Sequence, residues 1–159
     1  MSDLKTKIEE IKTYINDLCV FTHFGGLCYL ETKDGVTYGI STEPDCNGNL
    51  YGNNHNELSG FLHISNMGNR TLNNQINQSV VNVDLHMFVP HKIIGESQKY
   101  YYVINHVFSR LQSKFWQKYT ITFNGNLLNK YKDVEYGIIT IQIPYFNGCE
   151  ELIKGNEVC

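Results

Sequence analysis

The segment 80–90 reads VVNVDLHMFVP, and its alternation constrains the fold of this chain more than any other feature. Successive side chains of a strand point to opposite faces, so one face here is apolar and the other polar. The apolar face comprises Val81, Val83, Leu85, Met87 and Val89. The polar face comprises Asn82, Asp84 and His86. The pattern predicts a strand with one face in a core, ended by Pro90 because proline lacks an amide donor.

Two segments have the period of a helix instead. In residues 3–18, apolar side chains recur every three or four positions, with charged residues between them. Ser2 or Asp3 can cap the first turn of this helix. The second predicted helix runs from about 97 to 117, and its apolar stripe consists of Tyr100, Ile104, Val107, Phe108, Leu111 and Phe115.

Further strands are predicted at 27–33, 36–42, about 60–66, 119–124 and 134–145. Asp34 and Gly35 separate the first two, and this pair is a strong signal for a two-residue hairpin because both residues accept a positive φ. Residues 43–59 and 67–78 are rich in Asn and poor in apolar side chains, so we expect loops there. This order predicts an α+β fold, a mostly antiparallel sheet with two packed helices. We expect one domain over 1–146 and a C-terminal tail over 147–159.

Charged residues make up 18 % and aromatic residues 13 % of the chain, which excludes a coiled coil or a charged disordered chain. No run of about 18 apolar residues occurs, and the charged start MSDLKTKIEE is not followed by an apolar run. We therefore expect no transmembrane helix and no secretory signal. The net charge is −3, without a Lys/Arg cluster to neutralise phosphates, so sequence-specific nucleic-acid binding is not expected.

The five cysteines contain no CxxC pair and are odd in number, which indicates free thiols in a reducing compartment. A zinc site would have to use Cys46, His55 and His63, but the close ligand pairs of structural zinc sites are absent. A catalytic thiol would have to come from Cys19 or Cys28 near His23, without any recognisable motif around them. We therefore predict no metal, no cofactor and no catalytic residue.

Two polar or aromatic groups remain as functional candidates. Asp84 and His86 share one strand face and could form a hydrogen-bonded pair, although a polar outer sheet face produces the same pattern. The run Tyr100-Tyr101-Tyr102 points in three directions on a helix, so at least one tyrosine faces away from the core. An exposed tyrosine of this kind suits an interface.

Over roughly residues 3–146 the chain resembles the tail-terminator or tail-completion family of bacteriophage neck proteins. The resemblance rests on an N-terminal helix, early strands and a long loop, followed by VVNVDLHMFVP, SQKYYYVINHVFSRLQSKF and YGIITIQIPYF. The high Asn content, with more Lys than Arg, is similar to that of phages with AT-rich genomes such as crAss-like phages. The predicted loops 43–59 and 67–78 are longer than the family pattern, and the tail is additional.

The resemblance implies a virion structural protein, made in the host cytoplasm, and not an enzyme. It implies a closed homo-oligomeric ring of six or twelve subunits at the portal–tail junction, with DNA passing through the channel without sequence-specific binding. Its neighbours would be the portal, an adjacent neck ring or tail-tube proteins. Two alternatives stay open: a small α+β enzyme or ligand-binding domain that uses Asp84 and His86, and a monomeric host-interaction module.

A ring subunit needs contact surfaces, and the two Asn-rich loops are the segments predicted to reach a neighbour. The apolar side chains predicted to form the interface are Tyr51, Leu58, Leu72 and Ile76. We expect these side chains to be exposed in the single subunit. We also expect deletion of residues 47–56 to abolish assembly while sparing the fold.

Overall fold

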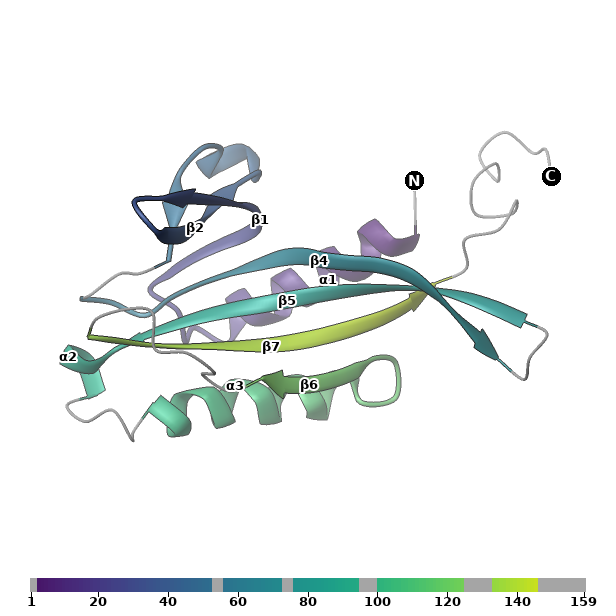
Figure 1. Ribbon diagram of the computed structural model, residues 1–159. Coiled ribbons are helices and arrows are strands. Elements are labelled where there is room, and N and C mark those ends of the chain that lie inside the picture. Colours follow the sequence, from purple (N-terminus) through teal and green to yellow (C-terminus); the bar gives the residue numbers. More distant parts are fainter. Residues whose placement is uncertain (1–2, 53–55, 73–75, 95–99, 125–132, 146–159) are drawn as a thin grey trace.

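The structure is a computed structural model that describes residues 3–52, 56–72, 76–94, 100–124 and 133–145. A seven-stranded sheet forms its centre, with the strand order β3-β2-β1-β4-β5-β7-β6 (Figure 1). The strands are β1 (His23–Lys33), β2 (Val36–Ser41), β3 (Leu50–Tyr51), β4 (Ser59–Leu72), β5 (Ile76–Pro90), β6 (Thr120–Asn124) and β7 (Val134–Tyr145). The helices are α1 (Asp3–Asp17), the single turn α2 (His91–Ile94) and α3 (Tyr100–Phe115), with a 3-10 turn at Pro44–Cys46.

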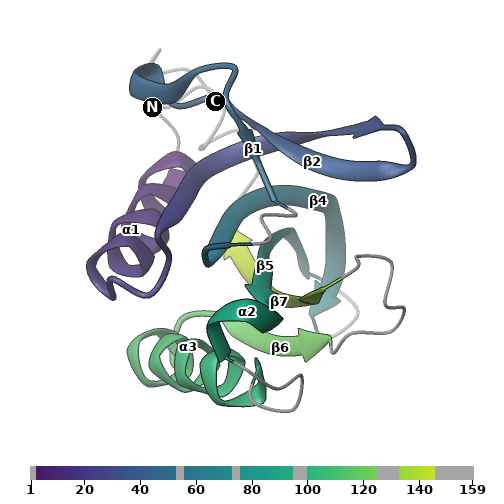
Figure 2. The same cartoon turned by 90° about the vertical axis from the view of Figure 1, so that its left-hand side faces the viewer.

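The predicted α+β class is confirmed. Neighbouring strands pair antiparallel, except that β1 runs parallel to β4 between His23 and Leu27. Both longer helices lie on the same side of the sheet (Figure 2). The strand that the alternation predicted is β5, which pairs with β4 on one side and with β7 on the other. It ends at Pro90, and α2 begins at the next residue.

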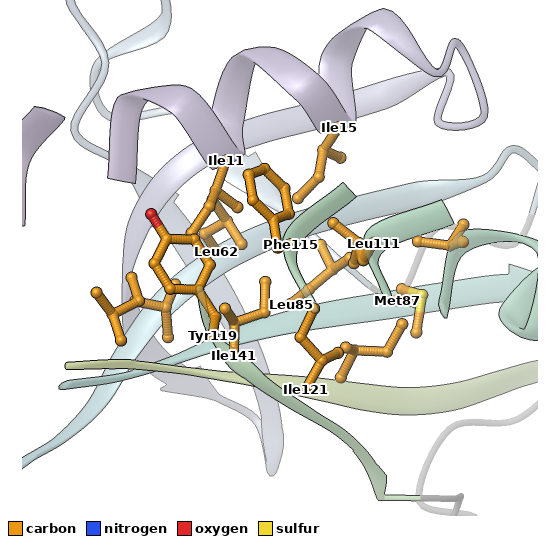
Figure 3. Close-up of a cluster of buried hydrophobic side chains, with 14 of the residues drawn as sticks. Ile11, Ile15, Leu62, Leu85, Met87, Leu111, Phe115, Tyr119, Ile121 and Ile141 are labelled. Carbon is orange, nitrogen blue, oxygen red and sulfur yellow. The ribbon is translucent and has the colours of Figure 1, made fainter. Parts of the chain in front are cut away.

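The main core lies between this sheet and the two helices. Ile11 and Ile15 of α1 and Leu111 and Phe115 of α3 point toward the strands (Figure 3). The predicted apolar face of β5 meets them, and its side chains have no exposed surface: Val81, Val83, Leu85, Met87 and Val89. Burying a side chain of this size contributes about 1.5–3 kcal/mol, so this face is the main reason for the helices to pack here.

A second, smaller core covers one end of the opposite sheet face. It contains Cys28, Phe61, Phe88 and Val134, with Tyr51 and Tyr136 packed against them. Gly39 of β2 lies directly over Phe61, since a Cβ atom at Gly39 would come within 2.8 Å of the ring. The small layer formed by β1, β2 and β3 therefore packs on the aromatic side chains of β4 and β5.

The hairpin between β1 and β2 has the predicted two-residue turn. Lys33 pairs with Val36, and the two residues between them have positive φ angles, 51° at Asp34 and 79° at Gly35. This combination defines a type I′ turn.

The predicted loop at 67–78 was wrong. Most of this segment continues β4 and β5 as a long hairpin, paired from Met67 and Val81 out to Leu72 and Ile76. The far part of these two strands projects beyond α1 and α3 (Figure 1). Among the described residues, α1 and α3 do not reach over this part of the hairpin, which is consistent with the lack of an apolar alternation in its sequence.

The predicted loop at 43–59 also contains ordered structure, the 3-10 turn and β3. Glu43 fixes its start, because its carboxylate lies 2.6 Å from the Lys12 ammonium of α1 and accepts a hydrogen bond from the Leu27 amide at 3.1 Å. The ion pair ties the turn to α1, and the hydrogen bond ties it to β1.

Replacing Gly35 by valine should destabilise the fold by about 1 kcal/mol or more, because a β-branched residue resists a positive φ. Gly68→Val is the matched control. A Cβ atom added at either glycine would meet no other atom within 4 Å, but only Gly35 has a positive φ, and valine is favoured in a strand. Urea unfolding should show a loss for Gly35→Val and none for Gly68→Val. Equal stability of the two variants would contradict the turn assignment.

Candidate functional site

Not all of the side chains predicted to form an interface are exposed in the single subunit. Tyr51 is half-buried in the second core, and a Cβ atom at Gly25 would lie 2.6 Å from its ring. Leu58 is half-buried against the main core. The expectation that these two are exposed in the single subunit was therefore wrong, because both pack on their own domain. The side chains of Leu72 and Ile76 lie outside the described residues.

The expected deletion of residues 47–56 would not spare the fold. It would remove β3, which pairs with Gly39 and Ile40 of β2, and it would remove the ring of Tyr51 from the second core. It would also remove Gly52, whose amide donates to the Ser59 hydroxyl at 3.1 Å. This segment supports the small layer of the sheet, so its deletion is no test of assembly.

Asp84 and His86 point to the same side of β5, as predicted, but each has its hydrogen bond with a residue of β7. The Thr140 hydroxyl donates to the Asp84 carboxylate at 2.8 Å. The Nδ1 atom of His86 lies 2.6 Å from the Tyr136 hydroxyl. The predicted pair is replaced by cross-strand contacts, which a polar row on adjacent strands forms readily.

His86 is one of the few buried polar side chains in the described part of the chain, with 6 % of its surface exposed. Its ring stacks on Phe61 at 4.7 Å between centroids, and His63 lies 5.8 Å away. Within the described residues, its Nε2 atom has no hydrogen-bond partner. Burial, with a smaller contribution from His63, lowers the pKa of His86 to about 3, so the ring is neutral at physiological pH. Burial also lowers the pKa of His63.

The candidate thiols have surroundings that suit structure more than catalysis. Burial, with smaller contributions from Cys46 and Glu43, raises the pKa of Cys28 to about 12, which holds this thiol protonated and weakly nucleophilic. The Cys28 thiol donates to the Gly25 carbonyl at 3.6 Å, while His23 faces Glu57 at 3.4 Å. Cys19 is exposed at the end of α1.

The two described residues considered for a zinc site, Cys46 and His63, have different neighbours. Cys46 contacts the Ser41 hydroxyl at 3.2 Å, and His63 lies on β4 beside His86. His55 lies outside the described residues. No group of three or more potential metal ligands occurs within the part of the chain that the structure describes.

The clearest functional feature is an aromatic face on α3. Tyr101 is 57 % exposed, Tyr102 77 % and the following Trp116 68 %. Between them the exposed side chains on this face are uncharged: Asn105, Ser109, Gln112 and Ser113. We call the seven residues the α3 face. Interface centres are enriched in aromatic residues and depleted of charge, and this composition matches them. The tyrosine run indicated such a surface, and Trp116 joins it because residues three and four positions apart share a helix face.

A groove of about 350 Å³ opens on one side of this face. It lies between α3 and β6 and is lined by Tyr101, Tyr102, Ile104, Asn105, Phe108 and Phe123. Its walls are mostly apolar, so it can hold an apolar side chain of a partner.

A second exposed apolar surface lies at the other end of the sheet. Tyr29 is 53 % exposed and Leu30 38 % on β1, and Leu50 is 47 % exposed on β3. In both views this end and the α3–β6 end lie on opposite sides of the molecule (Figures 1 and 2). Outside these two ends, one large apolar residue in the described part of the chain is exposed, Met67 on the β4–β5 hairpin.

Comparison of the chain with protein-family models, with curated proteins and with solved structures finds no match. The helices that the structure describes are each too short or too polar to cross a membrane.

The unfolding free energy should fall as the pH drops from 6.5 toward 3, because the unfolded chain then binds a proton at His86 that the folded chain excludes. At pH 5 this linkage costs about 2 kcal/mol. His86→Phe keeps the stacking and should remove most of this loss, measured by urea unfolding at pH 7 and pH 5. His106→Gln, at an exposed position, is the control. A wild-type pH dependence in His86→Phe would contradict the assignment.

Proposed function

We propose that this protein is a structural subunit of a bacteriophage virion that assembles head-to-tail into a closed ring at the portal–tail junction. The ring contains six or twelve copies and surrounds the DNA channel. It contacts the portal, an adjacent neck ring or the tail tube. The proposal joins the resemblance to neck proteins with the surface of the folded subunit.

The observation that carries the proposal is the position of the exposed apolar side chains. In the described part of the chain all but Met67 lie on β1 and β3 or on the α3 face, at opposite ends of one sheet: Tyr29, Leu30 and Leu50 at one end, and Tyr101, Tyr102 and Trp116 at the other. Isolated exposed apolar residues are normal on a monomer, but clustered aromatic residues indicate contact surfaces. A subunit with two different contact surfaces forms heterologous contacts, which close into a ring when the rotation between neighbours allows it.

The charge of the chain is compatible with a DNA channel. A lining that binds phosphates would hold the DNA, since Lys and Arg release its counterions. The chain has 13 basic and 16 acidic residues and a net charge of −3. DNA can slide through a ring of such subunits without sequence-specific contacts.

The polar face of β5 gives less support to an enzyme. Asp84 and His86 are each engaged with β7, and the neutral, enclosed His86 ring is held by aromatic neighbours. A general acid or base must reach the proton that it transfers. The arrangement suits a structural role, in which these side chains support the packing of the layer formed by β1, β2 and β3.

Electron microscopy of the purified protein, together with native mass spectrometry, tests the ring. We expect one closed species of six or twelve copies with a central opening. In purified phage particles that contain the protein, antibodies against it should label the head–tail junction. A monomer under all conditions, or label spread over the capsid, would contradict the proposal.

A further inference from the structure

The hairpin of β1 and β2 leaves the body of the sheet. β1 pairs with β4 only between His23 and Leu27, and the remainder of β1 pairs with β2 alone. Pairing between β2 and β3 is confined to Gly39 and Ile40. Residues 29–38 thus form a two-stranded ribbon, and its residues 29–35 are all exposed. A two-stranded ribbon is marginally stable by itself in water, so a partner surface would stabilise it.

The ribbon has apolar side chains on both of its faces. Tyr29 and Leu30 are neighbours on a strand and therefore point to opposite sides, yet both are exposed. Near its tip the ribbon carries Glu31, Lys33 and Asp34, and the Lys33 ammonium lies 3.9 Å from the Glu31 carboxylate, so the tip has a net charge of −1. Residues 23–52 as a whole contain four acidic side chains and one basic side chain, Lys33.

The α3 end of the molecule has the complementary charge. Residues 100–124 contain Arg110, Lys114 and Lys118 and no acidic residue. Lys118 lies 3.5 Å from the Glu10 carboxylate of α1, so Arg110 and Lys114 are the charges considered for a neighbour. His106, Arg110 and Lys114 are spaced four apart, so they form one row along the helix beside the α3 face, and all three are exposed. An aromatic, uncharged face with a basic row beside it fits an apolar ribbon with an acidic tip.

We propose that the β1–β2 ribbon of one copy docks on the α3 face of the next copy. Tyr29 and Glu31 share one face of the ribbon, and this face meets the next copy. Tyr29 packs on the exposed aromatic side chains of the α3 face beside the groove, and Glu31 and Asp34 approach Arg110 and Lys114. The ribbon cannot reach its own α3, because the two lie at opposite ends of the sheet (Figure 1). The occupant is therefore a second copy of this chain. This inference rests on the proposed function to the extent that both require self-assembly.

Two surface variants test the contact. The ribbon variant carries Tyr29→Ser and Leu30→Ser, and the helix variant carries Tyr102→Ser and Trp116→Ser. All four side chains are more than a third exposed, so both variants should fold, which circular dichroism and thermal melting check. Each variant alone should be monomeric by light scattering. Met67→Ser, at an exposed position outside both surfaces, should assemble as wild type does.

Mixing the two variants gives the decisive result. The ribbon variant keeps an intact α3 face, and the helix variant keeps an intact ribbon, so the mixture should form a one-to-one dimer of twice the 18.3 kDa subunit mass and nothing larger. Glu31→Lys should weaken assembly at least tenfold, and Arg110→Glu added to it should restore most of the loss.

The outcomes separate this contact from the proposed ring. Rings that persist in both variants, or a mixture without dimers, would overturn the contact and leave the ring intact. Open chains of wild-type protein that are lost in both variants would support the contact and overturn ring closure. Wild-type protein that is monomeric at every concentration, with no dimer in the mixture, would overturn both.

Discussion

Burial of the alternating face of β5 is the interaction on which the rest of this structure depends. Its apolar side chains receive α1 and α3 from one side, and the strand pairs with β4 and β7 along its length. Its other face carries Phe88 and His86, and with Phe61 these side chains form the surface on which the small layer of β1, β2 and β3 packs. One strand therefore organises two cores, and a change of register by one residue would exchange their contents.

This arrangement determines where the protein can make contacts. The two helices use their apolar stripes against the sheet, and the small layer uses its inner side against Phe61 and Phe88. Among the described residues, the outer face of α3 and the ribbon of β1 and β2 carry most of the large apolar side chains that stay exposed. The two surfaces are different in shape and charge, and they lie at opposite ends of the sheet. The proposed head-to-tail association would use these two surfaces.

Local pattern was sufficient to predict a large part of the fold. The α+β class, β5 with its two faces, the end of β5 at Pro90 and the turn at Asp34 and Gly35 all follow from spacing or from turn chemistry. Prediction failed where contacts with residues far apart in the sequence determine the local structure. Residues 67–72 lack an apolar alternation and are a strand because they pair with 76–81. Tyr51 is half-buried because Gly25 leaves space for its ring. The partners of Asp84 and His86 come from β7, which lies 56 and 50 residues further along the chain.

Of the two proposed contact surfaces, the sequence indicated the one on α3 and did not indicate the ribbon. Helical spacing indicated an exposed tyrosine on α3, but polar loops looked better suited to reach a neighbour, and this favoured Tyr51 and Leu58. Isolated apolar residues in polar segments often pack on their own domain, and the fold shows that these two do. The exposed ribbon was not foreseen, since the parallel pairing that ends at Leu27 is a property of the assembled sheet.

Amide hydrogen exchange, measured on dilute monomer and on assembled protein, tests the central claim most directly. If the two ends of the sheet meet in the assembly, residues 29–38 and 101–116 should gain protection together, while residues 59–72 change little. Assembly that leaves the exchange of both segments unchanged would contradict the claim that the opposite ends of this sheet are its contact surfaces.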